Sequence, residues 1–144
     1  MIKIKNISAQ DTYEIRLAVL RKNIDLPYKF KEDELENTFH LGAFYNNKLV
    51  GIASFMQNRI DVVNGEQYQL RGMATLPEVR GMGAGRLLIE EAKRILKVKG
   101  IDVLWCNARK EAVGFYKSLN FVTIGKEFEV QKVGPHFKMY YIVN

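Results

Sequence analysis

The sequence predicts a mixed α/β domain, α+β-like, with a central, mostly antiparallel twisted sheet of about six to seven strands flanked by four helices. Three observations lead to this prediction. The first residues alternate apolar and polar side chains, as a half-buried strand does. Strand-like segments separated by turn residues then follow between positions 40 and 75. The rest of the chain alternates helical and strand-like patterns, which indicates helices packed over the sheet.

The first part of the chain is expected to form a strand and two short helices. Residues 2–7 (IKIKNI) are predicted as a strand. Ser8 and Asp11 are polar residues of the kind that open a helix, and apolar residues at helical spacing continue that helix over 12–22. The acidic segment 31–39 (KEDELENTF) is predicted as the second helix.

Three antiparallel strands are expected next. The stretch 41–57 (LGAFYNNKLVGIASFMQ) predicts a hairpin that turns at Asn46-Asn47-Lys48, because asparagine tolerates a positive φ. A third strand over 67–75 follows a turn near Asn64-Gly65.

The last part of the chain predicts two helices and three strands. Apolar residues at helical spacing give a helix that starts near Gly83, runs to Lys99 and ends where Gly100 suits a left-handed cap. A buried strand is predicted over 103–108, followed by a helix over 110–119 that ends at Asn120. Two late strands, 121–130 and 137–143, are separated by Gly134-Pro135.

Composition limits the kind of protein. With 144 residues and 47 % hydrophobic content, the chain is expected to form one domain, 1–144. The sequence shows no signal-like start, no apolar run of membrane-spanning length and a single cysteine, so we expect a cytoplasmic protein with no membrane partner. The net charge of +6 suits an anionic ligand. Because the basic residues are scattered, a nucleic-acid-binding domain ranks last among the functions considered and no nucleic acid partner is expected.

A glycine-rich stretch, PEVRGMGAGRLL at 77–88, lies between a strand and a helix. The unpaired amides and the dipole at such a helix start favour phosphate, and Arg80 and Arg86 add positive charge. A Walker P-loop is excluded because no Gly-Lys-Ser/Thr occurs. A dinucleotide fingerprint fits poorly, since its last glycine would fall on Arg86 or Leu88.

Arg80, Gly83 and Gly85 match the pattern Arg/Gln-x-x-Gly-x-Gly/Ala, and with this loop the chain resembles the GNAT family of acyl-CoA-dependent N-acyltransferases. CNARKEAVGFYKSLNF, 106–121, looks like that family's second diagnostic stretch. The resemblance extends over nearly the whole chain. It implies the GNAT fold with a splay between strands 4 and 5, acetyl-CoA as co-substrate, and coenzyme-binding positions at Met73, Ala74, Thr75, Arg80, Gly81, Met82, Gly83, Ala84, Gly85, Arg86, Asn107 and Tyr116.

The same resemblance suggests how the acyl group moves. Tyr116 is the candidate acid that protonates the leaving thiolate, although a tyrosine beside Phe115 also suits a core. The base is open, because Gln69 stands where some family members have a glutamate. Glu66, Glu127 and His136 are the candidates.

The acceptor is not identified by the sequence, and a small-molecule or peptide amine is expected. Strand alternation predicts that Arg71 and Met73 lie on one face. If Arg71 and Arg109 both face the cleft, they are candidates to clamp a carboxylate or other anion; a surface or inter-strand ion pair is the alternative. Segments 23–39, with Tyr28 and Phe30, and 125–137 are expected to shape the acceptor pocket.

Other chemistry is disfavoured. Cys106 is expected to be a buried core thiol and not a nucleophile, and no metal is expected because His40 and His136 show no ligand spacing. Because Gln69 cannot take a proton, a non-catalytic regulatory module that binds coenzyme A or acetyl-CoA stays as the alternative to an acetyltransferase. A homodimer is left open.

Overall fold

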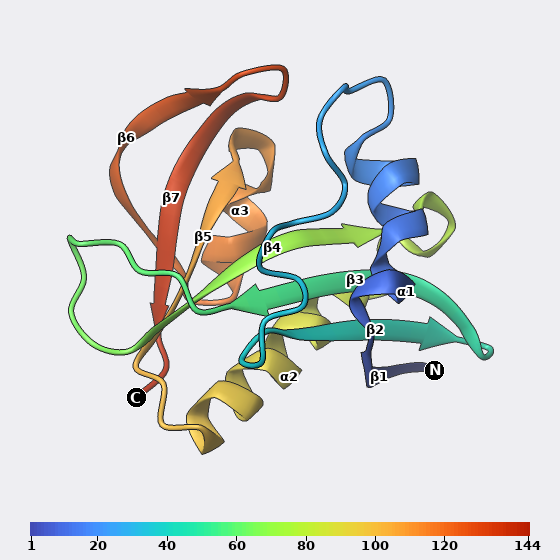
Figure 1. Cartoon of the computed structure of the whole chain (residues 1–144), viewed down its shortest axis with the longest axis horizontal. Coiled ribbons are helices and arrows are strands. Elements are labelled where there is room, and N and C mark those ends of the chain that lie inside the picture. Colours follow the sequence, from blue (N-terminus) through green and yellow to red (C-terminus); the bar gives the residue numbers. More distant parts are fainter.

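The computed structural model describes residues 1–144 and contains one seven-stranded sheet in the order β1-β2-β3-β4-β5-β7-β6 (Figure 1). All neighbouring strands are antiparallel except β4 and β5, which run parallel. The strands are β1 Ile2–Ile7, β2 Phe39–Tyr45, β3 Lys48–Met56, β4 Gln67–Thr75, β5 Val103–Arg109, β6 Val122–Val130 and β7 Gly134–Ile142. The predicted fold class is therefore confirmed.

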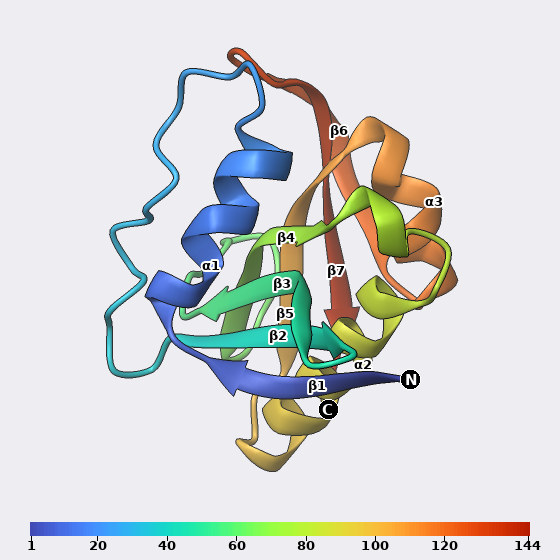
Figure 2. The same cartoon turned by 90° about the vertical axis from the view of Figure 1, so that its right-hand side faces the viewer.

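Helices cover both faces of the sheet (Figure 2). The helix α1 (Ala9–Ile15) lies on one face, whereas α2 (Ala84–Val98) and α3 (Val113–Ser118) lie on the other. Short helical turns extend or precede these helices; they are the π-helical turn Arg16–Leu20 and the 3₁₀ turns Pro77–Val79 and Lys110–Ala112. None of these helices is long and apolar enough to cross a membrane.

Local sequence explains where these elements begin and end. Ser8 and Asp11 form a capping box at the start of α1, with each side chain bonded to the other residue's amide. The β2–β3 hairpin turns at Asn46 and Asn47, which have φ of 51° and 65°. Gly100, with φ of 75°, follows α2 as expected.

Two local predictions differ from the structure. Residues 31–38 form turns where a helix was predicted, because the Asp33 carboxylate is bonded to Arg16 and to the Phe30 amide. The structure therefore has three α-helices in place of four. Gly134 and Pro135 belong to β7, so the turn between β6 and β7 falls at residues 131–133.

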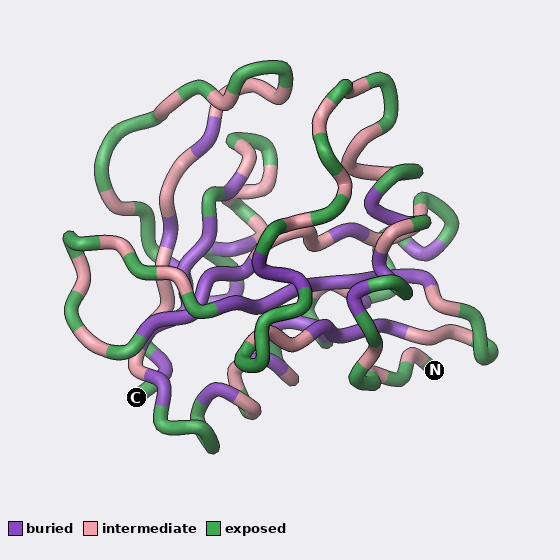
Figure 3. Tube along the Cα trace, viewed as in Figure 1, coloured by how far each residue is buried: buried purple, intermediate pink, exposed green.

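The main core lies between the sheet and α2 (Figure 3). Leu88, Ile89, Ala92 and Leu96 recur at helical spacing and are fully buried. They pack with strand residues such as Phe55, which is also fully buried. This packing fixes the start of α2, and with it the glycine loop, against the sheet.

The sheet opens between β4 and β5. These strands pair only from Gln67 opposite Val103 to Leu70 opposite Cys106. The rest of β4 keeps its partner β3, while β5 turns away with β7. The predicted splay between strands 4 and 5 is thus present, and it exposes one main-chain edge of β4.

Candidate active site

A cavity of about 1040 Å³ occupies this opening. Its walls are β4, β5, the glycine loop, the start of α3, residues 19–32 and the β6–β7 hairpin. Of the 33 residues that line it, seven are arginine or lysine, whereas Glu32 is the single acidic residue. The cavity is therefore suited to anionic ligands.

The glycine loop forms one end of the cavity. Gly81 and Gly83 have φ of 85° and 84°, and a Cβ at either position would meet no atom of a non-neighbouring residue within 4 Å. Glycine is favoured there by the backbone conformation. Gly85 has a different role, since a Cβ there would lie 3.1 Å from the Phe115 ring, so that glycine lets α2 and α3 approach closely.

Five backbone amides of this loop have no acceptor within the protein. Ala84, Gly85 and Arg86 form the first turn of α2, where no earlier helical carbonyl is available. The other two belong to Gly81 and Gly83. Together with the exposed side chains of Arg80 and Arg86, these unpaired amides are suited to an anion at the start of the helix.

The exposed edge of β4 contains a β-bulge. Ser54 pairs with Arg71 but Ile52 pairs with Ala74, so β4 has one extra residue here, and Gly72 has φ of 64°. The bulge makes the alternation prediction wrong: Met73 packs against the main core, whereas Arg71 lies on the other face against Phe30. Both residues still line the cavity.

Tyr116 lines the cavity from α3 and is 7 % exposed. Its ring contacts Phe115 and Phe121 edge-on. Burial, with the nearby Cys106 thiol, raises the pKa of the phenol well above its usual value. Tyr116 is therefore fully protonated at neutral pH and able to donate a hydrogen bond.

The three base candidates occupy different places. Glu66 does not line the cavity; it lies before β4, where its amide donates to Asp102 Oδ2 and its carbonyl accepts from the Asp102 amide. Glu127 is also outside the lining and pairs with Lys110 at 3.1 Å. His136 lines the cavity and is 6 % exposed.

The remaining predicted coenzyme positions are arranged around the opening. Met73, Ala74 and Thr75 line the cavity from β4, and Asn107 lines it from β5, where its Oδ1 accepts a hydrogen bond from Lys138 Nζ at 2.8 Å. Met82 is the one predicted position in the loop that is not part of the lining.

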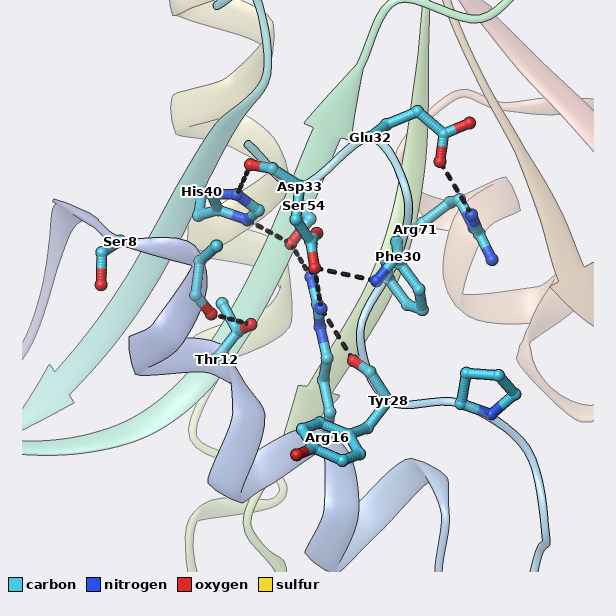
Figure 4. Close-up of polar contacts among 12 residues, drawn as sticks. Ser8, Thr12, Arg16, Tyr28, Phe30, Glu32, Asp33, His40, Ser54 and Arg71 are labelled. Atoms are coloured by element: carbon cyan, nitrogen blue, oxygen red, sulfur yellow. Dashed lines mark hydrogen bonds and ion pairs between the residues drawn. The ribbon is translucent and has the colours of Figure 1, made fainter. Parts of the chain in front are cut away.

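A buried polar network holds the segment 21–38 against the sheet (Figure 4). Arg16, 1 % exposed, donates to both oxygens of Asp33 at 2.8 and 3.0 Å and to Ser54 Oγ at 2.8 Å. His40 contacts the same Ser54 hydroxyl at 2.7 Å. Burial alone raises the pKa of Asp33, but hydrogen bonds from Arg16 and the Phe30 amide outweigh it and lower that pKa.

This network places two side chains in the cavity. The Phe30 ring lies between the guanidinium groups of Arg16 and Arg71, 3.9 and 4.0 Å from its centroid. Glu32, next in the same segment, lies 3.6 Å from Arg71 Nη1 (Figure 4). Phe30 and Tyr28 were both expected to shape this pocket. Phe30 lines the cavity, whereas Tyr28 lies outside the lining and its carbonyl accepts a hydrogen bond from Arg16 Nη1.

Arg21 was not predicted as a cavity residue, and Glu32 was not singled out although it falls in segment 23–39, which was expected to shape the acceptor pocket. Arg21 follows α1 and its Nε donates to the Pro27 carbonyl at 2.9 Å. Glu32 falls in the segment expected to be helical. The proline at 27 was the one local sign that this segment folds back over the sheet. Cys106 is 2 % exposed, and burial raises the pKa of its thiol, as expected for a core residue.

Comparisons with known proteins agree with this description. A family model described as an acetyltransferase (GNAT) domain matches residues 8–142. An uncharacterized N-acetyltransferase of Bacillus subtilis (strain 168), YitI, is 42 % identical over 142 residues, which cover 97 % of this chain and 95 % of that protein. The chain is therefore an acyltransferase.

Solved structures share the fold. Escherichia coli ElaA aligns with a TM-score of 0.78 and 20 % identity, covering 97 % of this chain and 99 % of ElaA. FeeM, an N-acyl amino acid synthase from uncultured soil microbes, aligns with a TM-score of 0.84 and 14 % identity, covering 99 % and 91 % of the two chains. Given the family match and the relative above, the protein belongs to the GNAT family of N-acetyltransferases.

Proposed function

We propose that the protein transfers an acetyl group from acetyl-CoA to a primary amine of a small molecule or peptide. GNAT acetyltransferases use acetyl-CoA as co-substrate. The observation that carries the proposal for this chain is the set of five unpaired amides in the glycine loop, at one end of the cavity. Amides at a helix start, with Arg80 and Arg86 beside them, suit the pyrophosphate of coenzyme A.

The exposed edge of β4 is suited to the pantetheine arm. Residues 71–75 have no strand partner on the β5 side, so their main-chain groups are available to an extended ligand. An amide-containing arm pairs with such an edge as an added strand would. Met73 and Thr75 are the residues that we propose to supply these main-chain groups.

Tyr116 is proposed to donate the proton that the leaving thiolate needs. In the transfer, the amine nitrogen bonds to the acetyl carbon, the carbon–sulfur bond breaks, and the thiolate takes up a proton. The burial that raises the pKa of Tyr116 also raises that of the adjacent Cys106 thiol. A leaving thiolate in the same surroundings is likewise disfavoured, so it needs a proton or a hydrogen bond, and the protonated phenol is the group in the cavity that we propose to supply it.

His136 is the base candidate that lines the cavity. Its Nδ1 lies 2.8 Å from the Gly134 carbonyl, and an Nδ1–H that donates to this oxygen leaves Nε2 free to accept a proton. We propose that His136, directly or through water, takes the proton that the amine loses. The single cysteine suits the cytoplasmic location that we also propose.

Thiol release from acetyl-CoA in the presence of an amine panel tests the proposal. We expect Tyr116→Phe to lower kcat by about 10²- to 10⁴-fold while the Kd of acetyl-CoA stays the same. Tyr45→Phe, at the end of β2 and outside the cavity, is the control and keeps full activity. Binding of acetyl-CoA without thiol release for any amine would instead support the non-catalytic regulatory module.

A further inference from the structure

The part of the cavity away from the glycine loop has unbalanced positive charge. Arg21, Arg71 and Arg109 line it, and Glu32 is the only acidic residue there. Arg71 lies 3.6 Å from Glu32, but neither Arg21 nor Arg109 forms an ion pair. Two guanidinium groups therefore face the cavity without a counter-charge.

Arg21 is fixed in this position by the backbone. Its Nε and Nη1 donate to the carbonyls of Pro27 and Leu20 at 2.9 and 3.2 Å. Burial, followed by repulsion from Arg109, Arg71 and Arg16, lowers the pKa of Arg21. Like charges are thus held near each other, and a bound anion would relieve their repulsion.

Glu32, in contrast, lacks a hydrogen-bond donor. It is 8 % exposed, and its Oε1, which lies 3.6 Å from Arg71 Nη1 in the ion pair, is buried and accepts no hydrogen bond. A buried carboxylate oxygen without a donor is unfavourable by comparison with one that accepts a hydrogen bond. An amine nitrogen in the cavity would supply the missing donor, because N–H groups of an amine or ammonium bond readily to carboxylates.

We propose that the acceptor is a zwitterionic amine whose anionic group binds to Arg21 and Arg109 and whose nitrogen donates to Glu32. The inference rests on the proposed acetyl transfer and names its substrate class. The anionic group is an oxyanion, either a carboxylate or a phosphate, since a guanidinium binds both. Glu32 is a specificity residue in this scheme, and His136 keeps the role of base.

Matched acceptor pairs test the charge requirement. O-phosphoethanolamine and ethanolamine differ by the phosphate, and β-alanine and β-alaninamide differ by the carboxylate. We expect kcat/KM from thiol release to be about 10- to 100-fold higher for the anionic member of at least one pair. The pair that discriminates identifies the oxyanion.

Variants separate the two ends of the acceptor. Arg109→Gln and Arg21→Gln are expected to abolish the preference for the anionic member, with little change for the neutral one. Glu32→Gln is expected to lower kcat/KM by the same factor, about tenfold, for both members, since both carry the amine. Arg94→Gln, on the exposed side of α2, is the control and leaves all values unchanged.

The outcomes distinguish this inference from the proposed function. Equal kcat/KM for both members of each pair, a preference for neutral amines, or no turnover of any member although acetyl-CoA binds would overturn the inference. Retained anion preference in Arg109→Gln and Arg21→Gln would also overturn it. Failure to bind acetyl-CoA, measured by calorimetry, would contradict the proposed function itself.

Discussion

Arg16→Met and Asp33→Leu test how the segment 21–38, which contains Phe30 and Glu32, is held against the sheet. Arg16 and Asp33 are 1 % and 5 % exposed and share two hydrogen bonds, so either substitution leaves the other charge buried without its partner. Breaking a buried pair in this way costs about 3–5 kcal/mol. For a 144-residue chain with an unfolding entropy of about 0.3 kcal/mol/K, Tm falls by about 10–17 °C.

The assay is urea unfolding of both single variants and of the double variant, with acceptor kinetics on the same proteins. The double variant leaves neither charge of the buried pair without its partner. Its loss in free energy of unfolding is therefore expected to be smaller than the sum of the two single losses by at least about 2 kcal/mol. Because the network places Phe30 and Glu32, KM for the acceptor should rise. The Kd of acetyl-CoA should change less, since no hydrogen bond links the glycine loop to this network.

The exposed ion pair between Lys48 and Glu78 provides the matched control. Its atoms are 3.2 Å apart, but the side chains are 64 % and 57 % exposed. Lys48→Met and Glu78→Leu are therefore expected to change stability far less. Additive losses in the double variant, or single losses below about 1 kcal/mol, would refute the buried-pair argument.

Three further predictions concern pH and backbone conformation. The pKa of Asp33 is lower in the folded state than in the unfolded state. Its ionised carboxylate therefore stabilises the fold above the unfolded pKa of about 3.9, and this stabilisation is lost as pH falls further. The free energy of unfolding of Asp33→Asn, measured against pH, should lack this acid-dependent loss. Gly83→Val, at φ of 84°, should weaken acetyl-CoA binding about tenfold in calorimetry, whereas Gly114→Ala, in α3 with open space around its Cβ, should not. Gly72→Ala should cost about 1–2 kcal/mol in urea unfolding, because φ is 64° and the new Cβ would lie 3.0 Å from Phe30.

The elements that were predicted correctly depend on local sequence. The hairpin at Asn46-Asn47, the end of α2 at Gly100 and the glycine loop need only residues that are neighbours in the chain. These conformations need residues that adopt a positive φ or that suit a helix terminus, and such residues can be recognised by their type in the sequence. The loop itself could therefore be predicted from sequence, although Met82, one of its residues, does not line the cavity.

The features that were missed depend on distant contacts. The segment 31–39 has the composition of a helix, yet Asp33 pairs with Arg16, which is 17 residues away. That contact cannot be seen in a local pattern, and it places Glu32 in the cavity. The bulge in β4 reversed the expected side of Met73 relative to Arg71, and a glycine at 72 inside a strand was the available indication.

The central claim is that the glycine loop binds coenzyme A through its free backbone amides. The most direct measurement is an NMR titration of the ¹⁵N-labelled protein with coenzyme A and, separately, with pantetheine, which lacks the pyrophosphate. We expect the amide resonances of Gly81, Gly83 and Gly85 to shift with coenzyme A and to stay in place with pantetheine. Binding of coenzyme A that leaves these three amides unshifted would contradict the claim.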